Sequence, residues 1–110
     1  MGRFVKGDVV VVPFPFSDLS ASKRRPACVV ATLTGDDVIL CQITSQGTRD
    51  QQVIPLTAND FVEGGLRRDS NIRPNRLFTA DSTIILYKTG TLSPSKIQEI
   101  TTKIIAIISS

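Results

Sequence analysis

Short runs of apolar and β-branched residues alternate with turn-forming residues over most of the chain. Such runs are typical of β-strands, and five or six short strands are expected here. The predicted strands span residues 8–12, 27–33, 38–43, 52–56, 71–79 and 83–89. Two of these runs flank Thr34-Gly35-Asp36-Asp37, a turn-forming tetrad, and this arrangement predicts a β-hairpin.

Prolines and glycines indicate where the strands stop. Pro13 and Pro15 are two residues apart, so they remove two N–H donors from the same side of the first strand. We expect that edge to be unpaired or bent, and the strand to end there. The polar and basic segment 17–25 predicts an exposed loop. Residues 59–65 predict a turn, or a single helical turn, that ends at two consecutive glycines.

The C-terminal segment changes to a helical period. Ser93 followed by Pro94 provides an N-cap and a proline at the first helical position. The apolar residues at helical spacing are Ile97, Ile100, Ile104, Ile107 and Ile108. They predict one amphipathic helix whose isoleucine stripe packs on the sheet. Short strands closed by one helix favour a mainly β fold, a small and strongly bent sheet or barrel, over a parallel α/β fold that needs crossover helices.

Length and charge place the chain among single globular domains. Its 110 residues, 41% of them hydrophobic, fit one domain spanning 1–110 and leave no room for two. The formal net charge is +3 and the sequence pI is 9.2. A mildly basic balance favours a polyanionic partner such as nucleic acid or an acidic protein.

Several classes of chemistry are excluded by what the sequence lacks. Without any histidine, paired-histidine nuclease chemistry is impossible, and Cys28 and Cys41 alone make a poor metal site, so no metal or other cofactor is expected. No apolar run approaches the ~20 residues of a membrane span, and the N-terminus has no long apolar stretch. We therefore expect a cytoplasmic protein with reduced thiols and no membrane association.

Two features could bind or cleave a phosphodiester. In Lys23-Arg24-Arg25-Pro26, the proline restrains Arg25, whose planar, permanently charged guanidinium suits a scissile phosphate. Thr44-Ser45 places two hydroxyls at a predicted strand end, where they could bind a phosphoryl oxygen or orient a ribose hydroxyl. Each feature also has an ordinary structural explanation: a solvated charge run for the first, turn-forming residues for the second.

A third feature is a cationic stretch over residues 67–76. It holds Arg67, Arg68, Arg73 and Arg76, and Arg73 repeats the arginine-proline arrangement of the first loop. Aromatic residues that could stack on nucleic-acid bases are few: Phe14, Phe16, Phe61, Phe78 and Tyr87. Together the three features describe an electropositive groove with hydroxyls.

The order of these motifs resembles the MazF/PemK family of toxin endoribonucleases. The matching residues are Gly7-Asp8-Val9-Val10, Arg25-Pro26-Ala27, Ile43-Thr44-Ser45, Arg73, and Leu77-Phe78-Thr79-Ala80-Asp81 before the closing helix. The resemblance implies a small SH3-like β-barrel of the CcdB/MazF/PemK type with a C-terminal helix. It also implies a homodimer, a cognate antitoxin, and metal-independent cleavage of single-stranded RNA, in particular messenger RNA, at short sequences. In that reaction the ribose 2′-hydroxyl attacks the adjacent phosphate and leaves a 2′,3′-cyclic phosphate.

The resemblance also implies roles for individual residues. The catalytic positions would be Arg25, Thr44 and Arg73, and the RNA-binding positions Lys23, Arg24, Ser45, Gln46, Asn75 and Arg76. Some family members carry a carboxylate where this chain has Asn75, and some carry a histidine in the first loop, where this chain has none. The general base is therefore open, with Asp81 and Asp18 as candidates, since an arginine with a pKa above ~12 stays protonated.

Two other functions fit the same resemblance. A related toxin of this fold poisons DNA gyrase without cleaving anything, and fold alone does not decide function. The chain could also be an inactive homologue that only binds antitoxin, for which Asn75 is the best support.

Overall fold

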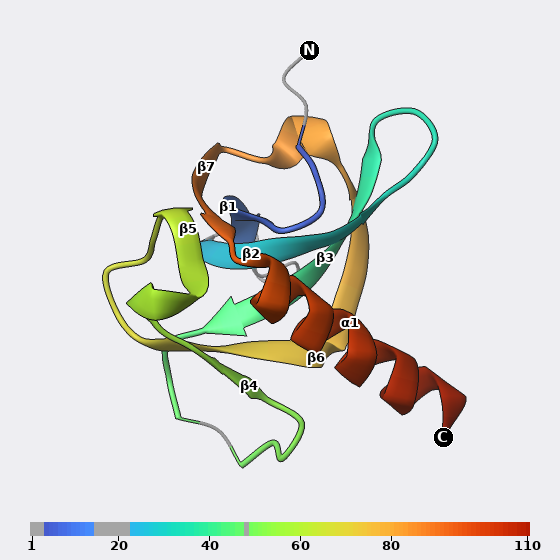
Figure 1. Ribbon diagram of the computed structural model, residues 1–110. Helices are drawn as coiled ribbons and strands as arrows, with labels where there is room; N and C mark the ends of the chain where they lie inside the picture. Colours follow the sequence, from blue (N-terminus) through green and yellow to red (C-terminus); the bar gives the residue numbers. More distant parts are fainter. Residues whose placement is uncertain (1–3, 15–22, 48) are drawn as a thin grey trace.

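The computed structural model describes residues 4–14, 23–47 and 49–110. Seven strands form one antiparallel sheet, and a single α-helix follows (Figure 1). The strands are β1 (Asp8–Phe14), β2 (Lys23–Thr32), β3 (Asp37–Thr44), β4 (Ile54–Leu56), β5 (Phe61–Gly64), β6 (Ser70–Asp81) and β7 (Tyr87–Leu92), and the helix is α1 (Pro94–Ser109). Two 3₁₀ turns, η1 (Ala58–Asp60) and η2 (Ser82–Ile84), connect strands. The prediction of a mainly β fold with a C-terminal helix is confirmed.

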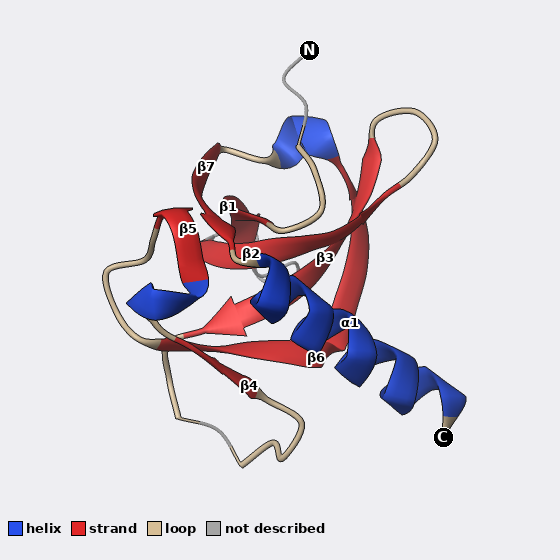
Figure 2. Ribbon diagram, viewed as in Figure 1, coloured by secondary structure: helices blue, strands red, loops and turns tan. Residues whose placement is uncertain are grey.

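The order of strands in the sheet is β4-β6-β3-β2-β1-β7-β5. The sheet curls into an open half-barrel with α1 lying across it, as Figure 2 shows. The predicted hairpin is confirmed, because β2 and β3 pair directly and the turn between them holds Gly35 at a φ of 85°. Within the described part of the chain, no helix is long and apolar enough to cross a bilayer.

Strand alternation divides the buried side chains between the two faces of the sheet. Val9 and Cys28 face one side and belong to a core on which Ile97, Ile100 and Ile104 of α1 pack. Val10 and Ala27 face the other side and belong to a second core, shared with Leu40 and Phe78 among others. The isoleucine stripe therefore packs on the sheet as predicted at its first three positions, but Ile108 is 72% exposed because the helix runs beyond the sheet.

The start of β2 differs from the sequence prediction. Residues 23–25 belong to a strand rather than a loop, because they pair with β1 as far as Phe14↔Lys23. The pairing of β1 with β7 ends earlier, at Val11↔Tyr87. Among the described residues, Pro13 thus has no partner on one edge of β1, as predicted. Pro15 and the loop residues 17–22 lie outside the described residues.

Two other boundaries also differ from the prediction. The expected helical turn at 59–65 is only the short η1, and residues 61–64 form β5, which pairs with β7 up to Gly64↔Gly90. The strand expected at 83–89 begins only at Tyr87, because 82–84 form η2, where the Asp81 carboxylate accepts a hydrogen bond from the N–H of Thr83 at 2.9 Å.

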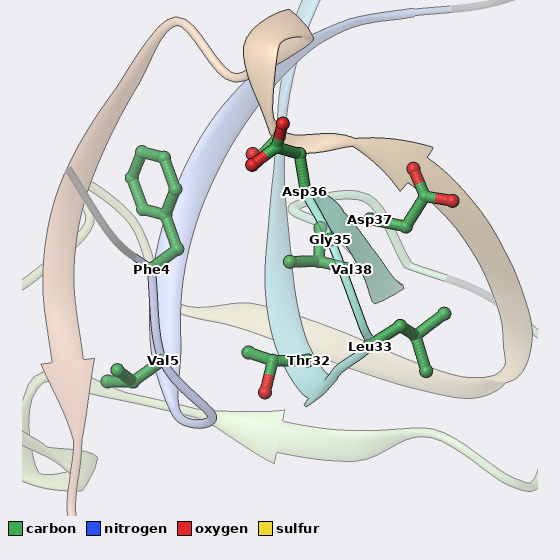
Figure 3. Close-up of a pocket in the computed structure, with 9 residues that line it drawn as sticks. Phe4, Val5, Thr32, Leu33, Gly35, Asp36, Asp37 and Val38 are labelled. Carbon is green, nitrogen blue, oxygen red and sulfur yellow. The ribbon is translucent and has the colours of Figure 1, made fainter. Parts of the chain in front are cut away.

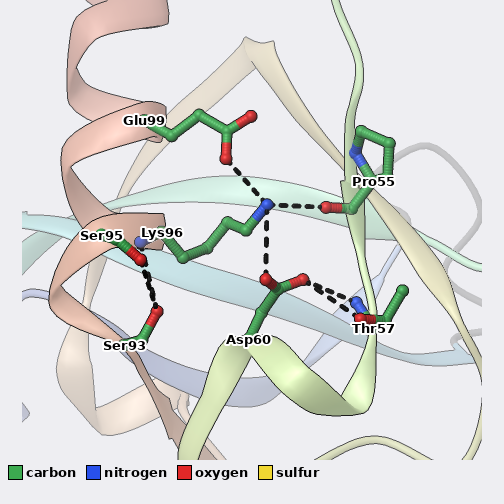
Figure 4. Close-up of polar contacts among 7 residues, drawn as sticks. All are labelled: Pro55, Thr57, Asp60, Ser93, Ser95, Lys96 and Glu99. Carbon is green, nitrogen blue, oxygen red and sulfur yellow. Dashed lines mark hydrogen bonds and ion pairs between the residues drawn. The ribbon is translucent and has the colours of Figure 1, made fainter.

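A nearly buried lysine joins the helix to the sheet (Figure 4). Ser93 caps α1 by accepting a bond from the N–H of Lys96 at 3.2 Å, with Pro94 in the first turn as predicted. The ammonium group of Lys96 donates to the carbonyl of Pro55 at 3.0 Å and to Glu99 at 2.8 Å, and lies 3.6 Å from Asp60. One side chain thus links α1, β4 and η1.

Candidate functional site

The residues implicated in catalysis lie on one face of the sheet. Ala27 on β2 is opposite Gln42 on β3, and Gln42 is opposite Arg73 on β6, so these three form a row across the sheet. Directly paired residues in antiparallel strands project to the same face, and so do residues two apart in a strand. Arg25 and Thr44, each two residues further along, therefore share the face of Arg73 at the same end of the sheet. Arg25 is half-buried and Thr44 is buried.

The Arg73 guanidinium is held by a carboxylate from another part of the chain. Its Nη2–H donates to Oδ2 of Asp50 at 3.3 Å, and the two side chains are only 19% and 10% exposed. The Nε–H of Arg73 is buried and has no hydrogen-bond partner among the described residues. The Arg73 guanidinium is thus held by Asp50 through Nη2, while its Nε–H can still donate a hydrogen bond.

An irregularity in β6 brings Asn75 to the same place. Leu77 is opposite Cys41 while Arg73 is opposite the next residue, Gln42, so residues 74–76 have no partners on β3. Bulges of this kind redirect side chains next to functional sites. The Asn75 side chain hydrogen-bonds to Asp50, and Asn75 and Arg76 are both exposed.

Several contacts keep Asp50 ionised. The pKa of its carboxyl is lowered chiefly by the hydrogen bond from the Gln52 backbone N–H, at 2.9 Å, and further by Asn75 and Arg73. Sequence reasoning missed Asp50 because it lies in the connection between β3 and β4, outside every motif and periodic segment. No sequence signal could have found it, since only the folded chain brings that connection to Arg73.

The Thr44 hydroxyl is oriented by its own turn. Its Oγ1 accepts a hydrogen bond from the N–H of Gln46 at 3.2 Å. An oxygen that accepts from the backbone in this way can still donate its own hydrogen. Thr44 can therefore donate to a phosphoryl oxygen, while the next two residues, Ser45 and Gln46, are exposed beside it.

A groove of about 560 Å³ opens beside this cluster. It is lined by Val11, Arg24, Pro26, Ser45, Gly65, Leu66, Arg67, Arg68, Ser70, Tyr87 and Thr89. The predicted RNA-binding residues Arg24 and Ser45 are thus brought together here. Lys23 is exposed at the start of the same strand as Arg24.

Of the two candidate bases, Asp81 is not brought to this cluster. Asp81 pairs with Asp37 at the far end of β3, seven residues from Thr44 and so roughly 23 Å away along the strand. That end carries its own pocket of about 290 Å³, whose charged lining residues are Asp36 and Asp37 (Figure 3). An acidic pocket of this kind repels phosphate. Asp18 lies outside the described residues.

The two cysteines are buried cross-strand neighbours beneath the cluster. Cys28 is opposite Cys41, and both are free thiols. The Cys41 thiol donates to the carbonyl of Arg73 at 3.0 Å. Desolvation raises the pKa of Cys41 to about 12 and that of Cys28 still further. Both therefore stay protonated at neutral pH, and the Cys41 thiol links β3 to β6.

The arrangement of these side chains suits a phosphate ligand whose oxygens gain negative charge in the transition state of a reaction. Two guanidiniums and one hydroxyl lie on a single face, and Asp50 fixes one guanidinium in advance. Preorganised donors of this type stabilise charge that develops on phosphoryl oxygens.

The fold is similar to those of solved toxins. A MazE–MazF complex from Deinococcus radiodurans superimposes with a TM-score of 0.76 at 16% identity, over 96% of this chain and 95% of that one. An endoribonuclease in complex with its cognate antitoxin from a mycobacterial species gives 0.74 at 14% identity, over 97% and 96%. The toxin MazF-mt6 from Mycobacterium tuberculosis gives 0.68 at 16% identity, over 93% and 96%.

At the level of sequence, no protein of curated function matches this chain. Residues 5–108 nevertheless match the PemK-like, MazF-like toxins of type II toxin–antitoxin systems. The match spans every described strand and nearly all of α1, and it confirms the resemblance read from the motifs. The chain therefore belongs to the family of PemK-like, MazF-like toxins of type II toxin–antitoxin systems.

Proposed function

We propose that this protein is a metal-independent endoribonuclease that cleaves single-stranded RNA at short sequences in messenger RNA. The observation that carries the proposal is the placement of Arg25, Thr44 and Arg73 on one face and at one end of the sheet, with Arg73 held by Asp50. The solved relatives described as endoribonucleases support the same assignment.

In the proposed reaction the ribose 2′-hydroxyl attacks the adjacent phosphorus. The 2′-hydroxyl gives up its proton, the bond from phosphorus to the 5′-oxygen of the next nucleotide breaks, and that oxygen takes up a proton, so the products carry a 2′,3′-cyclic phosphate and a 5′-hydroxyl. Arg25 and Arg73 neutralise the charge that builds on the non-bridging oxygens, and Thr44 donates a hydrogen bond to one of them. In this proposal the two guanidiniums act as cations and hydrogen-bond donors.

The proposal includes an antitoxin partner. An acidic segment would cover the arginine-rich surface and block access of RNA, by charge complementarity. Two of the solved relatives are complexes with antitoxins, which supports this partner. We also propose a homodimer acting in the cytoplasm, where free thiols such as Cys28 and Cys41 stay reduced.

The test is incubation of the purified protein with a long single-stranded RNA in excess EDTA, beside an Arg25→Ala variant. We expect cleavage by the wild type in EDTA, cyclic-phosphate and 5′-hydroxyl ends, and loss of cleavage in the variant. Asp37→Asn, at the far end of β3, is the control and should cleave normally. Intact RNA under all conditions would contradict the proposal and favour a non-enzymatic toxin, such as a gyrase poison, or an inactive antitoxin binder.

A further inference from the structure

The groove beside the catalytic cluster lies on the opposite face of the sheet. Val11, Pro26 and Tyr87 form one row across β1, β2 and β7, and all three line the groove. Arg24 is two residues from Pro26 and shares that face, whereas Arg25 faces the other way. The neighbouring residues Thr44 and Ser45 divide similarly, since Ser45 lines the groove. At this end of the sheet, two sites thus lie on opposite faces. Arg24 and Ser45 belong to the groove, and their neighbours Arg25 and Thr44 belong to the other face.

The groove is positively charged. Its charged lining residues are Arg24, Arg67 and Arg68, which come from β2 and from the connection between β5 and β6. All three are exposed, and none of the described residues that line the groove is a carboxylate. Among the described residues none of the three arginines takes part in an ion pair. Their charge is therefore available to an anion.

An aromatic ring completes the groove. Tyr87 is 49% exposed and lies at the start of β7, opposite Val11. A tyrosine ring beside arginines offers what a nucleotide requires, a flat surface for the base and cations for the phosphate. The volume of about 560 Å³ lies in the range of small-ligand sites.

We infer that this groove binds a nucleotide of the RNA that flanks the cleaved bond, with its base stacked on Tyr87 and its phosphates held by Arg24, Arg67 and Arg68. In this arrangement the RNA strand crosses the end of the β-sheet at Thr44-Ser45. Its scissile phosphate lies on one face of the sheet and the flanking nucleotide lies in the groove on the other face. This inference rests on the proposed function for the identity of the ligand. It assigns base preference beside the cleaved bond to Tyr87.

Direct binding tests the groove without requiring cleavage. The probe is a fluorescent 20-nucleotide single-stranded DNA of random sequence, which lacks the attacking 2′-hydroxyl, and the measurement is anisotropy over a range of salt concentrations. The Arg67→Ala/Arg68→Ala double variant should bind more weakly, and the slope of log K against log salt should become shallower by about 1.4, since each phosphate contact contributes about 0.7. Tyr87→Ala should weaken binding by between about 5-fold and 100-fold with an unchanged slope.

Matched variants separate stacking from folding. Tyr87→Phe keeps the ring and should bind like the wild type, and Lys103→Ala on α1 removes a charge elsewhere and should leave the slope unchanged. Thermal melts by circular dichroism establish that each variant is folded. Unchanged affinity and slope in both groove variants would overturn the inference, as would a groove that binds poly-glutamate in preference to the oligonucleotide.

Cleavage of a long RNA with mapping of the fragment ends is the second readout. Tyr87→Ala should broaden the base preference at one position next to the cut while cutting continues. If the wild type cleaves nothing but the groove variants lose oligonucleotide binding, the proposed function fails and the binding site is supported. If cleavage proceeds with identical fragments in the wild type and both groove variants, the groove inference fails and the proposed function stands.

Discussion

The carboxylate of Asp50 and the guanidinium of Arg73 form an ion pair at 3.3 Å across 23 residues of sequence. The pair joins the connection between β3 and β4 to the irregular part of β6. Asp50 also accepts bonds from Gln52 and Asn75, which fixes its position and lowers its pKa. These contacts hold the Arg73 guanidinium in place, and under the proposed function Asp50 would be a positioning residue.

Replacing Asp50 by asparagine should separate RNA binding from RNA cleavage. The variant loses one negative charge, so its binding to single-stranded nucleic acid should be unchanged or tighter. Its kcat should nevertheless fall by roughly 10- to 100-fold, because Arg73 loses the group that orients it. Single-turnover cleavage beside equilibrium binding measures both quantities.

Asp37→Asn is the matched control for the Asp50 substitution, since it makes the same charge change at the far end of β3. It should alter neither quantity. A second variant, Asp50→Asn with Asn75→Asp, returns a carboxylate to the same neighbourhood and should recover part of the lost rate. An Asp50→Asn protein with an unchanged kcat would show that Asp50 has no positioning role.

Acid should weaken the contribution of Asp50 to stability. A carboxyl whose pKa is lowered on folding stabilises the native state above its unfolded pKa of about 4, and this stabilisation is lost as the pH falls through the folded value. Urea unfolding between pH 3 and pH 6 should therefore show a steeper loss of stability in the wild type than in Asp50→Asn. Parallel curves for the two proteins would contradict this prediction.

Replacing Lys96 by methionine should destabilise the fold. The change leaves the carbonyl of Pro55 without its donor and Asp60 without its cation. Removing one member of a buried pair costs up to about 5 kcal/mol, and because Asp60 and Glu99 are partly exposed we expect about 2–3 kcal/mol. The melting temperature should fall by roughly 10 to 20 °C.

Lys103→Met is the control for Lys96 because it makes the same change two turns later on α1. Among the described residues Lys103 takes part in no ion pair. The melting temperature of the Lys103→Met variant should stay within a few degrees of that of the wild type. Equal melting temperatures for the two variants would mean that the Lys96 contacts add nothing to stability.

The paired glycines 64 and 65 should respond differently to alanine. Gly64 has a φ of +67°, and a Cβ there would clash with the carbonyl oxygen of Thr89, so Gly64→Ala should cost about 2–4 kcal/mol. A Cβ at Gly65 would meet none of the described heavy atoms within 4 Å, so Gly65→Ala should change the free energy of unfolding by less than about 0.5 kcal/mol. Urea unfolding of both proteins checks this, and a Gly64→Ala protein as stable as Gly65→Ala would disprove the close β5–β7 approach.

The buried thiols should be unreactive in the native protein. Because burial raises the pKa of Cys41 to about 12, little thiolate exists at pH 8, and labelling by iodoacetamide should require unfolding. Because folding raises the thiol pKa values, the thiols contribute fully to the free energy of unfolding below their unfolded pKa of about 8.5. That contribution declines as the pH rises from there towards 12. A Cys28→Ala/Cys41→Ala protein should show a smaller decline. Rapid labelling at pH 8 under native conditions would contradict the prediction.

The sequence by itself determined the local elements of this protein. The apolar runs around Thr34-Gly35-Asp36-Asp37 specified the hairpin, and Ser93-Pro94 specified the start of the helix, because caps, turns and periodicity act over a few residues. Family membership was also readable from the order of the arginine and hydroxyl motifs. These features depend only on neighbours along the chain.

Tertiary structure decided which residues meet. Residues 23–25 form a strand despite their polarity, because β1 offers a partner, and β5 exists because β7 lies beside it. Because residues 23–25 form a strand, the neighbouring side chains of Arg24 and Arg25 face opposite sides of the sheet. Strand register placed Asp81 at the far end of β3 from Thr44. The pairing of Asp50 with Arg73 depends on how a connection folds over an irregular strand. Contacts between distant segments of this kind have no local sequence signal, and therefore only the folded chain reveals them.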